Sequence, residues 1–469
     1  GIPAYDSKIN VFENLRVDST GLYADGSISY NQLRVFSKKI RLFPDSVSGF
    51  TDKAFLYRGY SKSKDFNYPD MDFSNSKFSF YNLSDDYFYL RHDSSRVKSE
   101  NESSLFTGFD RSMEIKGDVW ISGNSLSSEG SLLYNSSIFI SDKFLFNSDL
   151  VTSDQASVIF NHYSYDSSFL KSNDVSLVLN VNDKKISLMA EYLDEENYYL
   201  PYYKTYTSVE NVDWDIINED LFFYNKNTLD IAPSFFPQED LFPNWSVTSN
   251  SANIDLKKKQ LKLNDVDELQ ISDAYILPRN GEVEIGENFS ISKLYDSEII
   301  LDTINEYHRF INASVDINSK DQFIGSGIYE YVNFNNDTFN IPFSEFKLVE
   351  TFDENEQKIK TSFSSGVVDK ESPILMEPGF NFFGNIELFA NNAQLLFNGK
   401  IIPSEIKNFN ENRAISYNNY FAPGDQLSIN ISEQDNFYSS AISKNGNDLY
   451  FEFFNNSVEK KSLVFFNPT

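Results

Sequence analysis

The residue types that carry out acid–base and nucleophilic chemistry are sparse in this 469-residue chain. Histidine occurs three times, at His92, His162 and His308, with no two close in sequence and no His-Glu-x-x-His pattern. The segment Gly123-Asn124-Ser125-Leu126-Ser127 contains half of a Gly-x-Ser-x-Gly nucleophile motif, but it lacks the second glycine and a strand pattern follows where a helix should begin. We therefore assign no catalytic and no cofactor-binding residue, and we expect a protein that is not an enzyme.

Carboxylates are the one abundant reactive group. The chain has 69 Asp and Glu against 40 Lys and Arg, which gives a formal net charge of −29. Glycoside hydrolysis needs only two carboxylates at a set separation, and any two strands can supply them, so this chemistry stays open. Nucleic acids are polyanions, and the only dense basic run, Lys257-Lys258-Lys259, has the pattern of a hairpin turn, so we expect no nucleic-acid partner.

Two groups of side chains could bind a ligand. Asp316, Asn318 and Asp321 place oxygen ligands at the short spacing that suits calcium, although a solvated loop has the same composition. Calcium is therefore the one cofactor that the sequence leaves open. Tyr198, Tyr199, Tyr202 and Tyr203 offer flat faces that could stack on a glycan, and the alternative is that they fill a core.

The elements that must position these groups are strands. Val212, Trp214 and Ile216 alternate with Asp213 and Asp215, a period-2 pattern that recurs along the chain between turn signals such as Asn398-Gly399. We find no pattern for a helix of more than about two turns. The chain has no cysteine, hence no disulfide or thiolate site, and no run approaches the ~20 apolar residues of a membrane span.

A repeat organises the first half of the chain. Residues 22–45 and 126–149 align without a gap at an offset of 104, with eight identities that include Gly26 with Gly130 and Asn31 with Asn135. The glycines are expected to supply a positive φ at the entry to a hairpin. Repeats of this kind bury their core against neighbouring units.

The predicted fold class is therefore all-β, with repeated antiparallel strand units that form either an elongated β-solenoid-like array or successive β-sandwiches. The expected division has four parts. They are a repeat unit at residues 1–110, a related unit at 111–215, a β-rich middle region at 216–345 and a C-terminal β region at 346–469.

Several segments resemble a known class of protein: residues 199–201 with 207–208 and 212–215, residues 274–278 with 281–285, residues 325–331, and residues 384–388. Together they are similar to parts of large exported β-rich proteins of the Bacteroidetes, and the similarity covers most of the chain. It implies a location outside the cytoplasm and a chain that is part of a longer one, but no chemistry. The repeated short amphipathic strands also resemble envelope proteins of the AsmA and TamB type, whose β-structured groove carries lipids.

Three functional hypotheses follow. The first is a non-enzymatic scaffold or binding protein of the bacterial envelope or cell surface, whose partners are other envelope proteins or neighbouring parts of a longer chain. The second is a carbohydrate-active enzyme or a glycan-binding module. The third is a lipid-carrying groove of the AsmA and TamB type. All three place the chain in the periplasm, at the outer membrane or on the cell surface.

Overall fold

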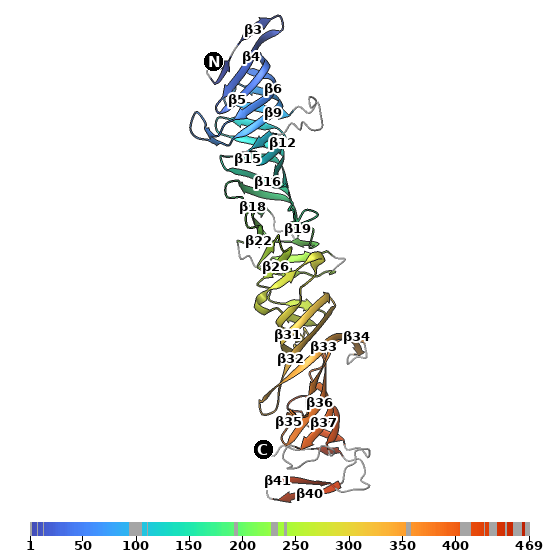
Figure 1. Ribbon diagram of the computed structural model, residues 1–469. Helices are drawn as coiled ribbons and strands as arrows, with labels where there is room; N and C mark the ends of the chain where they lie inside the picture. The colour runs from blue at the N-terminus through green and yellow to red at the C-terminus, as the bar shows by residue number, and fades with distance from the viewer. Residues whose placement is uncertain are drawn as a thin grey trace. The chain divides into compact units, whose positions relative to one another are not determined.

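The protein is nearly all β in the computed structural model, as the sequence predicts (Figure 1). The structure describes residues 2–6, 8–12, 14–92, 106–109, 111–191, 196–226, 233–238, 242–352, 358–403, 414–425, 427–430, 439–445, 448–453 and 462–464. Within these ranges the only helical turns are the two 3-10 segments η2 (Arg279–Gly281) and η3 (Glu287–Phe289). None of the described helices is long and apolar enough to cross a membrane.

The chain divides into two compact units. The first contains Gly1–Asn264 and Glu284–Ser290, and the second contains Asp265–Val283 and Ile291–Thr469. The first of the boundaries expected from the sequence, at residues 110 and 111, falls between two short strands of a single sheet in the first unit. The four-part division stays a prediction.

The first unit is built around long antiparallel strands that follow one another in sequence. One group contains β4 (Gly21–Tyr30), β5 (Leu33–Leu42), β6 (Ser46–Leu56) and β9 (Met71–Tyr81). A second group contains β14 (Leu126–Tyr134), β15 (Ser137–Phe146), β16 (Leu150–Phe160) and β17 (Leu170–Asn180). In both groups each strand pairs with the next (Figure 1).

Short strands join the two groups. The last long strand of the first group, β9, pairs with two short strands, each along a different part of its length. One half of β9 pairs with β10 (Tyr87–His92) and its start pairs with β11 (Phe106–Gly108). Those two strands pair with β13 (Val119–Ser122) and β12 (Met113–Lys116), which both pair with β14. The sheet is thereby continuous from the first group to the second.

The same arrangement recurs after β17. Its two ends pair with β18 (Lys185–Ala190) and β19 (Tyr198–Leu200). One branch continues from β18 through β21 (Asn211–Asp215), β22 (Asp220–Tyr224), β25 (Ser251–Asp255) and β26 (Gln260–Asn264). The other continues from β19 through β20 (Thr205–Thr207), β23 (Ser234–Pro237) and β24 (Val247–Thr248). The sheet also includes β29 (Val283–Ile285), and β7 (Gly59–Tyr60) and β8 (Asn67–Tyr68) form a separate pair.

The 104-residue offset found in the sequence also relates strand positions and registers. The chain begins with β1 (Ile2–Ala4), β2 (Ile9–Phe12) and β3 (Leu15–Asp18), which lie 104 residues before β11, β12 and β13. Leu15 pairs with Ala24, and Val119 pairs with Ser128. The irregularity between Ala24 and Gly26 recurs between Ser128 and Gly130. The repeat therefore spans six strands, β1–β6 and β11–β16, well beyond the segment with clear sequence identity.

Buried serine hydroxyl groups form hydrogen bonds with the backbone where the alternation of the long strands is interrupted. In β5, the two successive outward residues Lys38 and Lys39 interrupt the alternation, and the Lys39 N–H donates to Ser37 Oγ at 3.3 Å. That hydroxyl donates to the carbonyl of Phe50 on β6 at 2.7 Å. An irregular strand leaves backbone groups without ladder partners, and the serine replaces those partners inside the sheet. In the second repeat Ser141 makes the equivalent contact with the Lys143 N–H at 3.0 Å.

The inward faces of these strands form a packed apolar core. Ile28, Val35, Val47 and Ala54 are each 0% exposed. Their counterparts 104 residues later are also buried, although two of them are larger: Leu132, Phe139, Val151 and Val158. The outward face carries charged residues, as alternation in a sheet with one wet face requires.

The second unit contains an antiparallel sheet of eleven strands. Its members are β27 (Leu269–Ile271), β28 (Ala274–Leu277), β30 (Leu294–Leu301), β31 (His308–Ser319), β32 (Gln322–Val332), β33 (Thr338–Phe352), β34 (Lys358–Val368), β35 (Ile374–Glu377), β36 (Phe380–Phe389), β37 (Leu395–Pro403) and β38 (Ile415–Phe421). Each strand pairs with the next one in this list, except that β34 pairs with β36 and not with β35. Among the described strands, β35 pairs with β36 alone. Two further pairs join β39 (Ser428–Asn430) to β42 (Ser462–Val464) and β40 (Ser439–Asn445) to β41 (Asp448–Phe453).

Candidate functional site

Three hairpin turns of the first unit share one local structure. They connect β17 to β18, β21 to β22, and β25 to β26, and they start at Asn180, Asp215 and Asp255. In each, the side-chain Oδ1 of the first residue accepts a hydrogen bond from the backbone N–H three residues later, at 2.9–3.0 Å. The fifth residue of each turn has a positive φ: Lys184 at 51°, Glu219 at 62° and Lys259 at 54°. Asn and Asp favour such turns because their side chains replace a backbone acceptor.

Backbone hydrogen bonds connect these turns into a ladder. The Val181 N–H donates to the carbonyl of Asp149 at 2.9 Å, the Ile216 N–H to that of Lys184 at 3.1 Å, and the Leu256 N–H to that of Glu219 at 3.1 Å. The second and third turns therefore each contact the preceding turn through its residue with positive φ. The first long-strand group has bonds of the same kind, from the Asn82 N–H to the Asp45 carbonyl at 2.8 Å and from the Tyr57 N–H to the Gln32 carbonyl at 3.1 Å.

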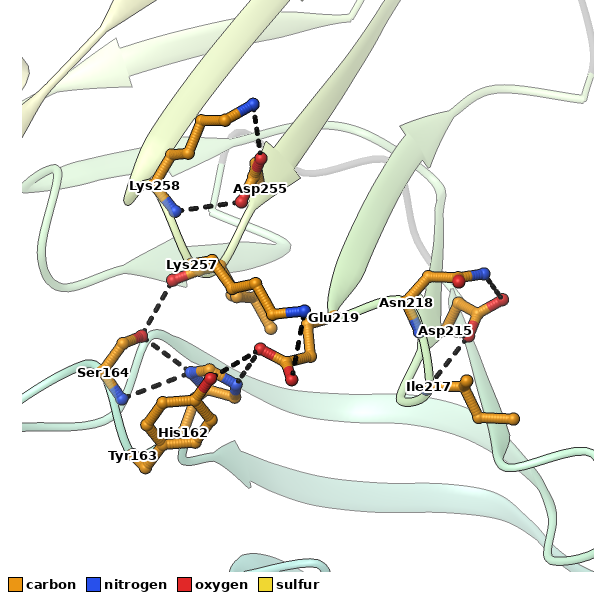
Figure 2. A network of polar contacts seen from close by, with 11 residues as sticks. His162, Tyr163, Ser164, Asp215, Ile217, Asn218, Glu219, Asp255, Lys257 and Lys258 are labelled. Carbon is orange, nitrogen blue, oxygen red and sulfur yellow. Dashed lines mark hydrogen bonds and ion pairs between the residues drawn. The ribbon is translucent and has the colours of Figure 1, made fainter.

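The Glu219 carboxylate is the centre of a polar cluster on this ladder (Figure 2). Its Oε2 accepts from the Tyr163 hydroxyl at 3.0 Å and lies 3.2 Å from His162 Nε2. Its Oε1 lies 3.5 Å from Lys257 Nζ. Because His162 and Tyr163 belong to the loop after β16, Glu219 to the second turn and Lys257 to the third, one carboxylate joins three connections of the sheet.

The His162 ring is held on both nitrogens. Nδ1 lies 2.7 Å from Ser164 Oγ and accepts from the Ser164 N–H at 3.3 Å, while that hydroxyl donates to the Leu256 carbonyl at 2.8 Å. The His162 side chain is 6% exposed. Burial, which disfavours the charged ring, lowers the pKa of His162 below its ordinary value, although the Glu219 carboxylate opposes the change. Nε2–H donation to Glu219 is consistent with a neutral ring.

Ser164, His162 and Glu219 have the residue types of a serine–histidine–acid triad. The Ser164 hydroxyl lies 2.7 Å from His162 Nδ1 and 2.8 Å from the Leu256 carbonyl oxygen. The contact with Leu256 connects the loop after β16 to the third turn. The cluster therefore joins connections of the sheet.

The sequence does not show this cluster, although a signal for the turns is present. Lys257 lies in a run with the pattern of a hairpin turn, and His162 has no other histidine close to it in sequence. The pairs Asn180-Val181, Asp215-Ile216 and Asp255-Leu256 share one pattern of a short amide or carboxylate before an aliphatic residue. Their unequal spacing conceals the pattern from a search for a fixed period.

The four tyrosines proposed as ligand-binding residues separate into two kinds. Tyr198 and Tyr203 are 0% exposed, so neither can present a ring face to a glycan, and the core interpretation holds for them. Tyr199 is half-buried and its ring lies 4.6 Å from that of Tyr206. Tyr202 is half-buried and contacts Tyr165, with ring centroids 5.1 Å apart. For Tyr199 and Tyr202 a role in ligand binding stays a prediction.

The three residues proposed for calcium lie near the turn between β31 and β32. Asp316 forms an ion pair with Lys293 at 2.8 Å, while Asn318 and Asp321 are exposed. In the part of the chain that the structure describes, no three His, Cys, Asp or Glu residues are grouped closely enough to hold a metal ion. A cation at Asp316 would have to displace the Lys293 ammonium group, and calcium binding stays a prediction.

His308 belongs to the second unit. His308 is 0% exposed, its Nε2 lies 2.7 Å from the Asn392 carbonyl oxygen, and burial lowers its pKa. It is therefore a packed side chain of the second unit, with both ring nitrogens near oxygen atoms. His92 is the last residue of β10, where it pairs with Ser76. Ser125 lies in the hairpin between β13 and β14, where its Oγ is 2.7 Å from that of Ser122.

The chain matches no protein-family model, no curated protein and no solved structure.

Proposed function

We propose that the chain is a non-enzymatic β-repeat scaffold or binding protein that works outside the cytoplasm, in the bacterial envelope or at the cell surface. The observation that carries this proposal is the repeat of six strands with one register at an offset of 104 residues. A repeated sheet extends a surface by adding units, and each added unit is stabilised by its neighbours. Its expected partners are other envelope proteins or neighbouring parts of a longer chain.

The polar cluster supports the same function. Glu219 and the turn ladder fix the connections along one side of the sheet. The inward faces of both repeats are filled by side chains of the sheet itself, such as Ile28 and Phe139 at 0% exposure. A packed interior favours a scaffold over a lipid-carrying groove, because a groove that holds acyl chains needs apolar side chains that solvent can reach when lipid is absent.

The proposal is tested with the gently purified 469-residue chain. We expect no product release from a panel of polysaccharides and no stoichiometric phospholipid in extracts examined by mass spectrometry. We also expect fractionation of the source cells to place the protein outside the cytoplasm. Release of soluble sugar would overturn the non-enzymatic assignment. One bound phospholipid per chain would favour the groove, and a cytoplasmic location would overturn the assignment to the envelope.

One observation favours glycan binding as a second candidate. Tyr89 and Trp120 are half-buried neighbours on β10 and β13, with ring centroids 5.2 Å apart. Adjacent aromatic rings on an outer sheet face suit stacking on a sugar. Binding isotherms with soluble oligosaccharides, compared between the natural chain and Trp120→Ala, test this candidate. Equal isotherms would contradict it.

A further inference from the structure

The outer face of the first unit carries two aromatic pairs on three neighbouring strands. Tyr81 of β9 lies opposite Tyr87 of β10, with ring centroids 5.1 Å apart. Tyr89, two residues further along β10, lies opposite Trp120 of β13, with ring centroids 5.2 Å apart. Phe88, between the two tyrosines of β10, is 0% exposed, so both pairs lie on the face of the sheet opposite the core.

Each pair belongs to a cross-strand row of four outward residues with a serine at both ends. The first row is Ser46, Tyr81, Tyr87 and Ser122, and the second row is Ser79, Tyr89, Trp120 and Ser127. Serine is a short side chain with a hydroxyl group that both donates and accepts hydrogen bonds. Each row therefore combines two flat apolar rings with a hydroxyl group on either side.

The two rows differ in how their hydroxyl groups are bonded. In the first row, each serine hydroxyl has a partner in its own turn, at 3.1 Å for Ser46 and 2.7 Å for Ser122. In the second row, the hydroxyl groups of Ser79 and Ser127 have no hydrogen-bond partner within the described ranges. The second row is thus better suited to bind the hydroxyl groups of a ligand.

A carboxylate and a guanidinium group lie beside the second row. The Tyr89 hydroxyl donates to Asp118 Oδ2, and Arg91 Nε lies 3.6 Å from the same oxygen. The Asp118 side chain is 16% exposed and that of Arg91 is 65% exposed. This pair supplies both an acceptor and a donor next to the Tyr89 ring.

Other rings on the outer face of this sheet differ, because cations cover them. Lys39 Nζ lies 4.9 Å from the centroid of the Tyr23 ring, and the Arg34 guanidinium lies 5.0 Å from that of Phe36. Within the described part of the chain, no Lys or Arg lies over a ring of either aromatic pair. A cation over a ring occupies the face that a ligand would use. The two pairs are therefore the rings of this face that suit stacking.

We propose that the two rows are two subsites for one uncharged, linear oligosaccharide. Its sugar rings stack with their C–H faces on the two aromatic pairs, and its hydroxyl groups bind Ser79, Ser127 and Asp118. A ligand that needs flat apolar contacts and hydroxyl partners in alternation matches the composition of both rows. The inference deepens the glycan-binding candidate given above, on which it rests, by naming the class of glycan and the polar residues that bind it.

Charge and spacing define this class. The net charge of −29 repels acidic glycans and favours neutral ones. The pairs are displaced by one strand spacing and by two residues along β10, which is about 8 Å on the surface of a sheet. A disaccharide therefore contacts mainly one pair, whereas a longer chain contacts both.

The test is calorimetric titration of the 469-residue chain with three neutral hexasaccharides, namely cellohexaose, laminarihexaose and mannohexaose. A hexasaccharide of galacturonic acid serves as the acidic comparison. We expect saturable binding of at least one neutral hexasaccharide, binding of its disaccharide that is about tenfold weaker or more, and no binding of the acidic chain. Because only the longer chain reaches the first row, Tyr81→Ala should weaken binding of the hexasaccharide and leave that of the disaccharide unchanged.

Substitutions in the second row test the assigned residues. Trp120→Ala should weaken binding about tenfold or more, and Trp120→Phe should restore most of it, since a ring remains. Ser127→Ala should weaken binding roughly threefold or more through the lost hydroxyl group, without removing a ring. Phe36→Ala is the matched control, because Phe36 is an exposed ring of the same sheet that Arg34 already covers, and it should bind like the natural chain.

Three results would overturn the inference. They are the absence of binding to all three neutral hexasaccharides, binding that neither Trp120→Ala nor Ser127→Ala weakens, and preference for the acidic chain. Equal losses for the hexasaccharide and the disaccharide in Tyr81→Ala would contradict the two subsites. Blank titrations leave the scaffold function standing, because location, lipid content and product release test that function separately. Release of sugar from a bound chain would overturn the non-enzymatic assignment and leave the subsites in place.

Discussion

The two repeats of the first unit use the same strands but hold their following loops by different side chains. Arg58 comes two residues after β6, and His162 comes two residues after β16, so they are 104 residues apart. Arg58 pairs with Asp149 in the turn between β15 and β16, and His162 pairs with Glu219 in the turn between β21 and β22. Each repeat thus contacts a turn that lies further along the chain through a cationic or ionisable residue at the same position.

The difference between these contacts is burial. The Arg58 side chain is 51% exposed and that of His162 is 6% exposed. An exposed ion pair contributes little to stability, because solvent screens it and both side chains lose conformational freedom. A buried histidine with partners on both nitrogens costs more to remove and responds to pH. Equivalent positions in a repeat can therefore keep the same contact and differ in strength.

The largest loss of stability is expected from substitution of a glycine that the two repeats share. Gly26 and Gly130 have φ of 119° and 112° at the equivalent irregularity in β4 and β14. A Cβ on Gly130 would lie 2.3 Å from the Lys116 carbonyl oxygen. We expect Gly130→Ala to lower the free energy of unfolding of the first unit by about 3 kcal/mol, from backbone strain together with this collision. Urea denaturation followed by tryptophan fluorescence measures it, since Trp120, Trp214 and Trp245 all lie in this unit.

Gly123→Ala is the control for that substitution. A Cβ on Gly123 meets no atom within 4 Å, so we expect its urea midpoint to equal that of the natural chain. A Gly130→Ala variant as stable as the Gly123→Ala variant would contradict the assignment of the irregularity as a position that requires glycine.

An intermediate effect separates the two loop contacts. His162→Ala removes a buried ring that contacts Glu219 and Ser164, and we expect it to cost about 1–2 kcal/mol of unfolding free energy. Arg58→Ala removes a half-exposed ion pair and should cost under about 1 kcal/mol. The same fluorescence titration compares both variants. Equal costs would show that burial of the histidine does not strengthen its contact.

The sequence predicted the strands and the repeat because both depend on local patterns. Alternation along Val212–Ile216 and the identity of Gly26 with Gly130 are visible in the residues themselves. The Glu219 cluster was not predictable in this way, because it joins residues as far apart as His162 and Lys257 through unequal loops. The four tyrosines show the same limit, since one tyrosine of each adjacent pair is buried and the other half-buried, and only the tertiary packing decides which ring is fully covered.

A pH titration sharpens the comparison further. Burial lowers the pKa of His162 from its ordinary 6.5, against the opposing Glu219 carboxylate, so the unfolded chain takes up a proton first as the pH falls. The contribution of His162 to stability is thus complete above the ordinary pKa and is lost as the pH falls below it. We expect the urea midpoint to decrease between about pH 7.5 and about pH 5.5, and this decrease to be smaller in His162→Gln. An equal decrease in both proteins would contradict this origin.

The smallest expected effect is a pH dependence of stability at position 58, opposite in sign to that expected for His162. Arg58→His places an exposed imidazole beside the Asp149 carboxylate, which should raise the pKa of the new histidine because solvent limits the cost of its charge. A raised folded-state pKa gives stability that is present below the unfolded pKa and is lost as the pH rises through the folded one. Relative to Arg58→Gln, the Arg58→His variant should therefore gain stability at about pH 5.5, by under about 1 kcal/mol, and should not differ at about pH 7.5. A gain at both pH values would show that ring packing, and not charge, stabilises the contact. A loss in acid would show that position 58 is buried like His162, and the contrast between the two repeats would then rest on side-chain type alone.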